Sequence, residues 1–371
     1  MKTKQAFTCI LVILLGCFLF TACGQSSNEG SGTREVVDMT GESVTIPYVV
    51  NRVLVDWVAG TQIVITLGAT DKLVGVSPWL DSRAPTFAET WTQLLIPGIE
   101  NVPVEAVAQH SGNTINAEGV LLLEPDLVIT DRLTRLELYR NAGLAAIFVD
   151  LSTKENYIES MLLIGEALGE AELEKANLFV DYLNANWTMV MDRIAAANLS
   201  NVDKQRIMYF QAHSNYDVVY NTIGVGEIQE AWITAAGGIL TTTDLVGRVE
   251  NGGVSREYIL SKNPELVFIG GQGSTALFNM LMNDAALASL DAVVNNNVVQ
   301  TPQGLFPWCR TGPEMAIHIV WAAKFLHPTL FEDIDMETMT RDFYLTFYGV
   351  ELSDRLIGEI LSGREYPSAT N

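Results

Sequence analysis

One arginine stands in a mostly apolar loop bounded by prolines, where residues 302–313 read PQGLFPWCRTGP. A guanidinium in such a loop can pair through two hydrogen bonds with a carboxylate or an oxyanion. The neighbouring Trp308 offers an aromatic face for a flat ring or an apolar chelate arm. We therefore expect a ligand to contact Arg310 and at least one of Trp79 and Trp308. A structural salt bridge is the alternative explanation for Arg310.

Further candidates follow the predicted strands of two α/β lobes. Ligands of open α/β sheets bind beyond the carboxyl ends of the strands, so polar and aromatic residues at these positions become candidates. The candidate ligand-binding residues are Trp57, Trp79, Asp131 and Arg132 in the first lobe and Gln211, His213, Tyr216, Gln272, Trp308 and Arg310 in the second. Each also has a structural explanation, because a tryptophan can belong to the core and an arginine or histidine can be a solvated surface residue.

Residue types suited to metal binding or covalent catalysis do not occur at the spacings that such chemistry needs. The histidines His110, His213, His318 and His327 form no HxH or HExxH pair, so the sequence predicts no directly ligated zinc or manganese and no cofactor. There is no GxSxG elbow, P-loop or CxxC pair. Cys309 is interpreted as a small buried residue rather than a reactive thiolate. We do not expect an enzyme.

Two stretches repeat one pattern. Residues 116–130 read NAEGVLLLEPDLVIT, and residues 255–270 read SREYILSKNPELVFIG. In each, a glutamate is followed seven residues later by proline, then by an acid and an apolar strand, so that Glu118 corresponds to Glu257. We expect both glutamates in the first turn of a short helix. There they would at least complement the helix dipole, a contribution of ~0.3–1 kcal/mol.

A long helix is predicted between these repeats, over residues 170–199. The stretch contains no glycine and no proline, and its apolar residues alternate at spacings of three and four, which places them on one face of a helix. About 28 helical residues would span roughly 42 Å, more than the ~30 Å diameter of a small domain. The helix is therefore predicted to bridge two bodies. The apolar stripe comprises Ala176, Val180, Leu183, Trp187, Val190, Ile194 and Ala197.

Strand and helix patterns alternate on both sides of this helix. The alternation predicts an α/β fold class, with two lobes of mainly parallel sheet joined by a single long α-helix. A chain of 371 residues is also too long for one ordinary core and suits two domains. A hairpin is predicted around Gly41, and helices 335–348 and 353–361 are expected to pack back across the lobes.

The amino terminus resembles a bacterial lipoprotein signal. Lys2 and Lys4 precede an apolar run over residues 10–20, and small residues then lead to Cys23. The run is short for a membrane span, and the alternative is a buried first helix. We predict that Cys23 is lipidated and that a multi-acyl anchor holds the chain to the membrane. The predicted segments are a signal peptide 1–22, a linker 23–34, a first lobe 35–169, a bridging helix 170–199, a second lobe 200–333 and C-terminal helices 334–371.

Charge and cysteine content limit the partners. The formal net charge is −22, and removing the signal would take away two lysines and no acid. Such a chain disfavours nucleic acid and anionic membrane surfaces as partners. Apart from the lipidated residue, only Cys309 would remain after cleavage, so no disulfide framework is predicted.

Several of these segments, taken in order, are similar to the iron-complex and corrinoid substrate-binding proteins of ABC importers. The matching pieces are the lipoprotein start, VTIP followed by RVLV, the two repeated stretches, AAGGIL at 235–240 and AAKFLHPTLF at 322–331. The resemblance implies two α/β lobes bridged by one long helix, as in class III periplasmic binding proteins. It implies a receptor that captures a solute outside the cell and delivers it to a permease dimer with its ATPase. At the two motif positions, Glu118 and Glu257 would dock onto arginines of the two permease subunits.

The leading hypothesis from the sequence is an extracytoplasmic, lipid-anchored and monomeric receptor for an iron complex, either a siderophore or haem. A corrinoid is the next alternative, followed by molybdate or tungstate, because relatives with this fold carry bare oxyanions and Arg310 would suit one. Two other classes remain open. A chelatase-like enzyme has a related bilobal fold, although the lipoprotein signal argues against that cytoplasmic chemistry. A docking module without a solute would show a cleft filled by side chains.

Overall fold

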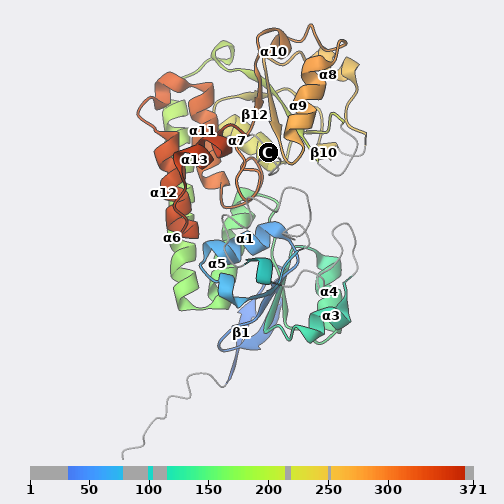
Figure 1. The fold of residues 1–371 in the computed structure, drawn as a ribbon, viewed down its shortest axis with the longest axis vertical. Coiled ribbons are helices and arrows are strands. Elements are labelled where there is room, and N and C mark those ends of the chain that lie inside the picture. Colours follow the sequence, from blue (N-terminus) through green and yellow to red (C-terminus); the bar gives the residue numbers. More distant parts are fainter. Residues whose placement is uncertain (1–31, 78–98, 103–114, 214–218, 250–251, 364–371) are drawn as a thin grey trace, which may run out of the picture. The chain divides into compact units, whose positions relative to one another are not determined.

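The computed structural model describes residues 32–77, 99–102, 115–213, 219–249 and 252–363 (Figure 1). Several predictions fall outside these ranges. They are the signal peptide 1–22, almost all of the linker 23–34, the lipidation site Cys23 and the ligand candidates Trp79 and Tyr216.

The first lobe is built on a parallel sheet with the strand order β4-β3-β5-β6. Every residue of β3 and β5 is buried, as expected for parallel strands covered on both faces. Helix α1 is buried along its whole length and is mainly apolar, as expected for a helix covered on all sides, with Gln62 among its few polar residues. The strands are β3 (Val53–Val55), β4 (Leu73–Gly75), β5 (Leu127–Thr130) and β6 (Ala146–Phe148), and the helices are α1 (Val58–Thr66), α3 (Ala117–Leu122), α4 (Leu133–Asn141) and α5 (Lys154–Leu168).

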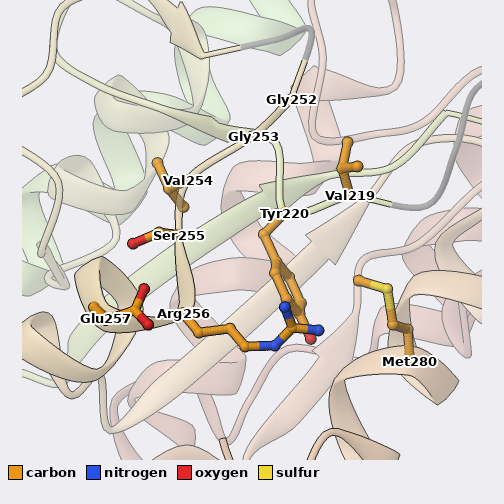
Figure 2. A pocket seen from close by; sticks show the side chains of 9 residues that line it. All are labelled: Val219, Tyr220, Gly252, Gly253, Val254, Ser255, Arg256, Glu257 and Met280. Atoms are coloured by element: carbon orange, nitrogen blue, oxygen red, sulfur yellow. The ribbon is translucent and has the colours of Figure 1, made fainter. Parts of the chain in front are cut away.

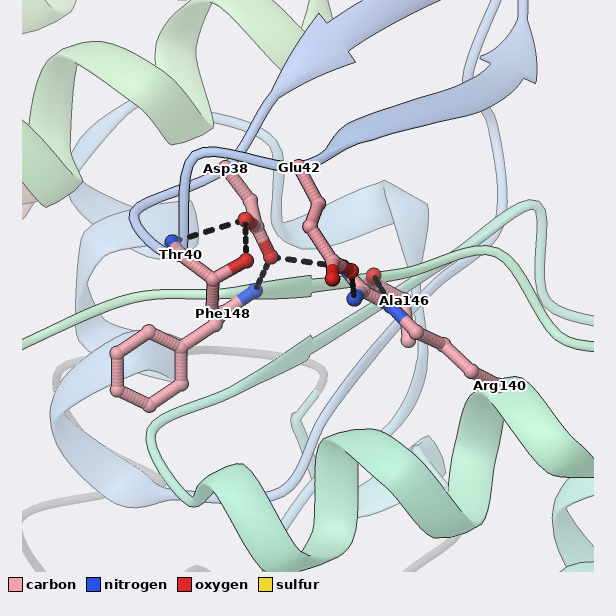
Figure 3. Close-up of polar contacts among 6 residues, drawn as sticks. All are labelled: Asp38, Thr40, Glu42, Arg140, Ala146 and Phe148. Carbon is pink, nitrogen blue, oxygen red and sulfur yellow. Dashed lines mark hydrogen bonds and ion pairs between the residues drawn. The ribbon is translucent and has the colours of Figure 1, made fainter.

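The hairpin predicted around Gly41 is confirmed. It consists of β1 (Thr33–Val37) and β2 (Ser43–Pro47), paired antiparallel, so strand β1 begins within the predicted linker 23–34. Asp38 fastens the hairpin to the first lobe (Figure 3). Its carboxylate accepts hydrogen bonds from the backbone N–H groups of Thr40 and Phe148, both at 2.9 Å, and forms an ion pair with Arg140 at 2.8 Å.

The second lobe contains a mixed sheet. Its centre is parallel, with the order β7-β11-β12 and with β9 beside β7, whereas β8 and β10 extend one edge in antiparallel fashion. The short antiparallel strands were not predicted. The strands are β7 (Arg206–Gln211), β8 (Thr222–Ile223), β9 (Ile239–Leu240), β10 (Arg248–Val249), β11 (Leu266–Gly270) and β12 (Val298–Gln300), and the helices are α7 (Ile228–Ala235), α8 (Arg256–Lys262), α9 (Ser274–Asn283), α10 (Asp291–Val294) and α11 (Met315–Leu326).

Helix α6 (Glu170–Ala196) is the predicted long helix and joins the two lobes (Figure 1). It packs against α5 of the first lobe and α11 of the second. The Asn186 amide donates to the backbone oxygen of Ala316 in α11 at 2.9 Å. Its buried residues follow the predicted stripe, with Phe179 buried beside the half-buried Val180. The predicted fold class, two α/β lobes joined by one long helix, is therefore confirmed.

The C-terminal helices α12 (Met336–Tyr348) and α13 (Asp354–Leu361) pack back onto the lobes as predicted. Helix α12 contacts both α1 and α11. Its Phe347 lies edge-on to Phe179 of α6, with ring centroids 5.3 Å apart. Aromatic packing of this kind stabilises a junction beyond the area it buries, so α12 helps to hold the two lobes to the bridging helix.

The sequence repeat corresponds to the same construction in each lobe. After α3, the carboxylate of Asp126 accepts hydrogen bonds from the backbone N–H groups of Asn51 and Arg52, at 2.8 and 2.9 Å. After α8, the carboxylate of Glu265 accepts from the N–H of Arg206 at 2.9 Å. Each acid therefore fixes the start of the neighbouring central strand, β3 or β7. This shared role explains why the proline-acid pair occurs in both stretches.

Candidate functional site

A cavity of about 230 Å³ is lined by both lobes. On the first lobe, strands β3, β5 and β6 are parallel and end at the same edge of the sheet, and the residues that follow them line the cavity. On the second lobe, the lining comes from β10 and the loop before α11. The lining residues are Trp57, Asp131, Arg132, Asp150, Leu151, Ser152, Arg248, Phe306, Arg310 and Thr311.

Three arginines line this cavity. The guanidinium of Arg310 lies 5.4 Å from the ring centroid of Phe306, and that of Arg132 lies 6.0 Å from the ring of Trp57. A cation–π contact helps to orient a guanidinium, and Nε of Arg132 also lies 4.0 Å from a carboxylate oxygen of Asp131. Arg248 is paired with Glu227 at 2.7 Å. The cavity is therefore lined by three arginines and two acids, Asp131 and Asp150, on a chain whose net charge is strongly negative.

Two carboxyl groups belong to the first-lobe side: the half-buried Asp131 lines the cavity, and the buried Asp56 directly precedes Trp57. Asp56 accepts hydrogen bonds from Thr130 at 2.9 Å and from Tyr139 at 3.2 Å, and it lies 3.4 Å from the buried Arg135. Burial raises the pKa of Asp56 to about 6, and burial likewise raises the pKa of Asp131. Desolvation thus shifts both groups toward their neutral forms. The balance of charge favours an anion.

The cavity brings together three residues predicted as ligand contacts, namely Trp57, Arg132 and Arg310. Asp131, a further candidate of the same edge, joins them. They come from segments far apart in the sequence, and the rule that placed them after strands accounts for all three first-lobe positions. Their role toward a ligand remains a prediction.

Trp308 and Gln211 are placed differently, and these two predictions are corrected. Trp308 is fully buried, and its indole N–H donates to the hydroxyl of Tyr344 at 3.4 Å. Gln211 is also buried and accepts a hydrogen bond from Tyr209 at 3.1 Å. Side chains that pack inward from a strand or loop have no surface to offer a ligand, and the sequence alone does not distinguish the two directions.

Two further candidates among the described residues do not line the cavity. His213 and Gln272 are half-buried residues that follow β7 and β11. Cys309 is fully buried, with its Sγ 3.2 Å from the hydroxyl of Tyr209, and burial raises the pKa of its thiol. Its interpretation as a small buried residue is confirmed.

Several lining residues were missed. Asp150 and Ser152 follow β6, so the strand-end rule could have found them. Phe306 shares its loop with Arg310. Arg248 lies on β10, a two-residue strand that is too short to produce a periodic pattern, so no sequence signal pointed to it.

The two repeated glutamates lie where they were expected. Glu118 and Glu257 are exposed and occupy the second positions of α3 and α8. The preceding residues, Asn116 and Ser255, cap these helices by accepting from backbone N–H groups at 3.1 and 3.2 Å. Backbone hydrogen bonding lowers the pKa of Glu257. The prediction of two first-turn carboxylates is confirmed, whereas their docking role is a separate proposal.

Glu257 also lines a polar cavity of about 410 Å³ on the second lobe (Figure 2). The guanidinium of Arg256 lies 5.9 Å from the ring of Tyr220 in the same cavity and is paired with Asp284 at 2.6 Å. The surface around Glu257 is therefore concave and charged.

Within the described ranges, no three histidine, cysteine or acidic residues are grouped closely enough to hold a metal ion. No described helix combines the length and hydropathy required to cross a bilayer.

Residues 58–305 match the periplasmic binding protein family. The chain is 25% identical over 355 residues to the molybdate-binding protein MolA of Haemophilus influenzae, covering 89% of this chain and 95% of that protein. It is 26% identical over 184 residues to the probable siderophore-binding lipoprotein YfiY of Bacillus subtilis, covering 46% of this chain and 51% of that protein. A periplasmic solute binding protein from Veillonella parvula has the same fold, with a TM-score of 0.75 and 23% identity over 89% of this chain and 97% of that chain.

The family match runs from α1 into the loop that carries Arg310, and so includes most of both lobes. The relatives are solute-binding transport proteins rather than enzymes. The resemblance seen in the sequence is confirmed, because fold, cavity and family agree. This chain belongs to the periplasmic binding protein family and is a solute-binding protein of an ABC importer.

Proposed function

We propose that this protein captures a small oxyanion of the molybdate and tungstate class between its two lobes and delivers it to a permease. The observation that carries the proposal is the convergence of Arg132, Arg248 and Arg310 on one cavity. Planar guanidinium groups match the oxygens of an oxyanion with charge-assisted hydrogen bonds. Because the chain is strongly acidic, three arginines at one cavity point to a role in binding an anion.

The size of the cavity supports a small ligand. Sites for drug-sized molecules measure roughly 300–1,000 Å³, and the cavity here measures about 230 Å³. An ion of a few atoms suits that volume better than a porphyrin or a corrin ring. The similarity to MolA, which is named for molybdate, supports the same ligand class.

An anionic iron complex is the second candidate. It was the leading hypothesis from the sequence, and the partial match to YfiY favours it. Trp57 and Phe306 would face the apolar arms of a chelate, while the arginines would hold its acidic groups. Because the cavity is small, such a complex fits it less well than a bare oxyanion does. A corrinoid or haem ranks below both because of its size.

Calorimetric titration decides between these ligands. The purified protein should bind molybdate and tungstate, bind sulfate more weakly, and show no heat with ferric siderophores or haem. Tight binding of a ferric complex with no response to molybdate would reverse the order of the two candidates. Native mass spectrometry of protein from its own host adds an independent measurement, since a retained ligand would be identified by mass.

Replacing Asp131 with asparagine should tighten oxyanion binding about three- to tenfold at pH 8. Its carboxylate lines the cavity and lies 4.0 Å from Nε of Arg132. Removing that charge relieves its repulsion of the anion. Since burial raises the pKa of Asp131, the gain should shrink at low pH, where the wild-type carboxyl group is neutral.

Calorimetry at two pH values measures this change. Asp342→Asn, an exposed change on α12, serves as the matched control and should leave affinity unaltered. Weaker binding by Asp131→Asn would mean that Asp131 accepts a hydrogen bond from the ligand, and would favour a protonated or hydroxylated ligand.

Delivery requires that the receptor stay near the permease, and we propose a lipid anchor on Cys23. Replacing Cys23 with alanine should move the protein from the membrane to the soluble fraction, because a thioether-linked lipid can form only on that cysteine. Cell fractionation with immunoblotting measures the shift, and Ser27→Ala in the same segment is the matched control. If the alanine variant stays membrane-bound at full length, residues 10–20 act as a membrane helix instead.

A further inference from the structure

We propose that the buried Glu314 is a positioning residue for the ligand cavity, and that a proton on its carboxyl group accompanies the bound anion. The inference rests on the proposed function of the cavity as an anion site. It assigns a role to a buried acid that does not line the cavity itself.

Glu314 connects the two walls of the cavity. It is 1% exposed and precedes α11. One carboxylate oxygen lies 3.3 Å from the amide nitrogen of Gln62 in α1, and the other lies 3.3 Å from the hydroxyl of Tyr344 in α12. The backbone N–H of Phe306 also hydrogen-bonds to this carboxyl group. Helix α1 begins directly after Trp57, so the contacts reach both the first-lobe wall and the loop that carries Arg310.

The loop has little room to move around these contacts. A methyl group on Gly304 would collide with the hydroxyl of Tyr344, and one on Gly312 would lie 3.3 Å from the side-chain oxygen of Gln62. Arg310 lies between these two closely packed glycines. A change in the contacts of Glu314 is therefore transmitted to the position of the guanidinium, because close-packed interiors pass on small displacements.

Glu314 is the one group of this cluster expected to exchange a proton near neutral pH, because the side chains that face it stay neutral. From α1 comes Gln62, which does not titrate. From α5 and α12 come the phenols Tyr157, Tyr344 and Tyr348, whose pKa values burial raises far above the usual range, so they stay neutral. Burial raises the pKa of Glu314 to about 7.

A protonated Glu314 also suits the hydrogen bonding of the cluster. The side-chain oxygen of Gln62 and the hydroxyl of Tyr157 are buried and have no hydrogen-bond partner among the described residues. A neutral carboxyl group can donate a hydrogen bond, whereas a carboxylate can only accept. A proton on Glu314 would thus offer a donor to a cluster in which the side-chain oxygen of Gln62 has no partner.

The bound anion favours that proton. Phe306 lines the cavity beside Arg310, and its backbone hydrogen-bonds to Glu314. A negative ligand in the cavity would therefore lie about one residue away from this acid, and like charges disfavour the ionised form. Binding should therefore raise the pKa of Glu314 and take up a proton. By linkage, the anion must bind more tightly when Glu314 is protonated, so affinity falls as pH rises through about 7. Asp56, with a pKa of about 6, adds a change of the same sign at lower pH.

The test is a molybdate titration of the full protein between pH 6 and pH 8.5 in pairs of buffers that differ in ionisation enthalpy. We expect the wild-type affinity to fall about three- to tenfold across this range, with proton uptake on binding near pH 7. Glu314→Gln, which is neutral at every pH, should flatten the profile and lose most of the uptake. Glu332→Gln, an exposed change, should keep the wild-type profile.

The outcomes separate this inference from the proposed function. If wild-type protein binds molybdate with no proton uptake near pH 7, the link between Glu314 and the anion is wrong, and this measurement needs no variant. Should Glu314→Gln fold, as its melting curve would show, but weaken binding equally at all pH values, the residue is merely structural. Absence of molybdate binding at every pH would overturn the proposed function and the inference together.

Discussion

Replacing Arg310 with alanine should weaken molybdate binding by at least about thirtyfold. Losing one partner of a desolvated, hydrogen-bonded charge pair typically costs ~2–5 kcal/mol, which corresponds to a factor of about thirty to several thousand in Kd. Arg310 stands in a loop held by buried contacts on both sides, and its guanidinium lies over the ring of Phe306 at the cavity. A charge held in place in this way loses little entropy on binding, so its full contribution should appear in the affinity.

Calorimetry of wild-type and variant protein measures the loss. Arg341→Ala is the matched control, because it removes an arginine of α12 that pairs with Asp354 and does not line the cavity. Its affinity should stay within about twofold of wild type, as expected for a distant surface charge that is screened by salt. Unchanged affinity in the Arg310 variant would remove this residue from the site and leave Arg132 and Arg248 to carry the charge.

Features that repeat over many residues were predictable. The stripe on α6 repeats along most of a helix of 27 residues, and the alternation of strand and helix recurs in both lobes, so each signal was averaged over a long segment. The two Glu-to-Pro stretches were recognisable because the acid at Asp126 or Glu265 performs one fixed task at the start of a central strand. Because each lobe needs an acid at this position, the same pattern of residues occurs in both stretches.

The site was only partly predictable for the opposite reason. The rule that ligands bind after strand ends found Trp57 and Arg132 but could not tell that Trp308 turns into the core, where it meets Tyr344. Arg248 lies on a strand of two residues, and its place at the cavity depends on an antiparallel pairing with β8. Contacts set by tertiary pairing leave no periodic trace in the sequence.

The buried acid Glu314 was likewise not among the candidates that the sequence pointed to. Its partners Gln62 and Tyr344 lie in α1 and α12, which are distant in the sequence. A buried carboxyl group is costly unless hydrogen-bonded or neutral, but the cost becomes visible only once the packing is known. Such a group is a better indicator of function in a structure than in a sequence.

Replacing both Glu118 and Glu257 with alanine should abolish uptake while solute affinity stays within about twofold of wild type. Both carboxylates are exposed at the second positions of α3 and α8, and neither lines the cavity that holds the arginines. Leu121 and Leu260 occupy equivalent places in the two repeats and are 45% and 37% exposed. A carboxylate beside an exposed leucine in each lobe suits a two-point contact with a permease dimer, with charge steering the approach.

The structural alternative is that each glutamate only complements its helix dipole, worth ~0.3–1 kcal/mol. Two other glutamates of the chain serve as a control for this helix-dipole alternative. Glu155 and Glu337 are also exposed acids at the second positions of helices, in α5 and α12, but lie outside the repeats. The control pair Glu155→Ala with Glu337→Ala should lower the melting temperature about as much as the docking pair.

Uptake of labelled molybdate by cells that express the cognate permease then separates the two explanations. The docking pair should reduce uptake to the background of cells without the receptor, whereas the control pair should transport normally, because only the docking pair loses its contact with the permease. Normal transport by the docking pair, or an equal defect in both pairs, would assign Glu118 and Glu257 to helix stability alone. A loss of solute affinity in the docking pair would instead place their effect in the cavity. Single variants show whether both lobes must engage, since a two-point contact loses most of its avidity when either point is removed.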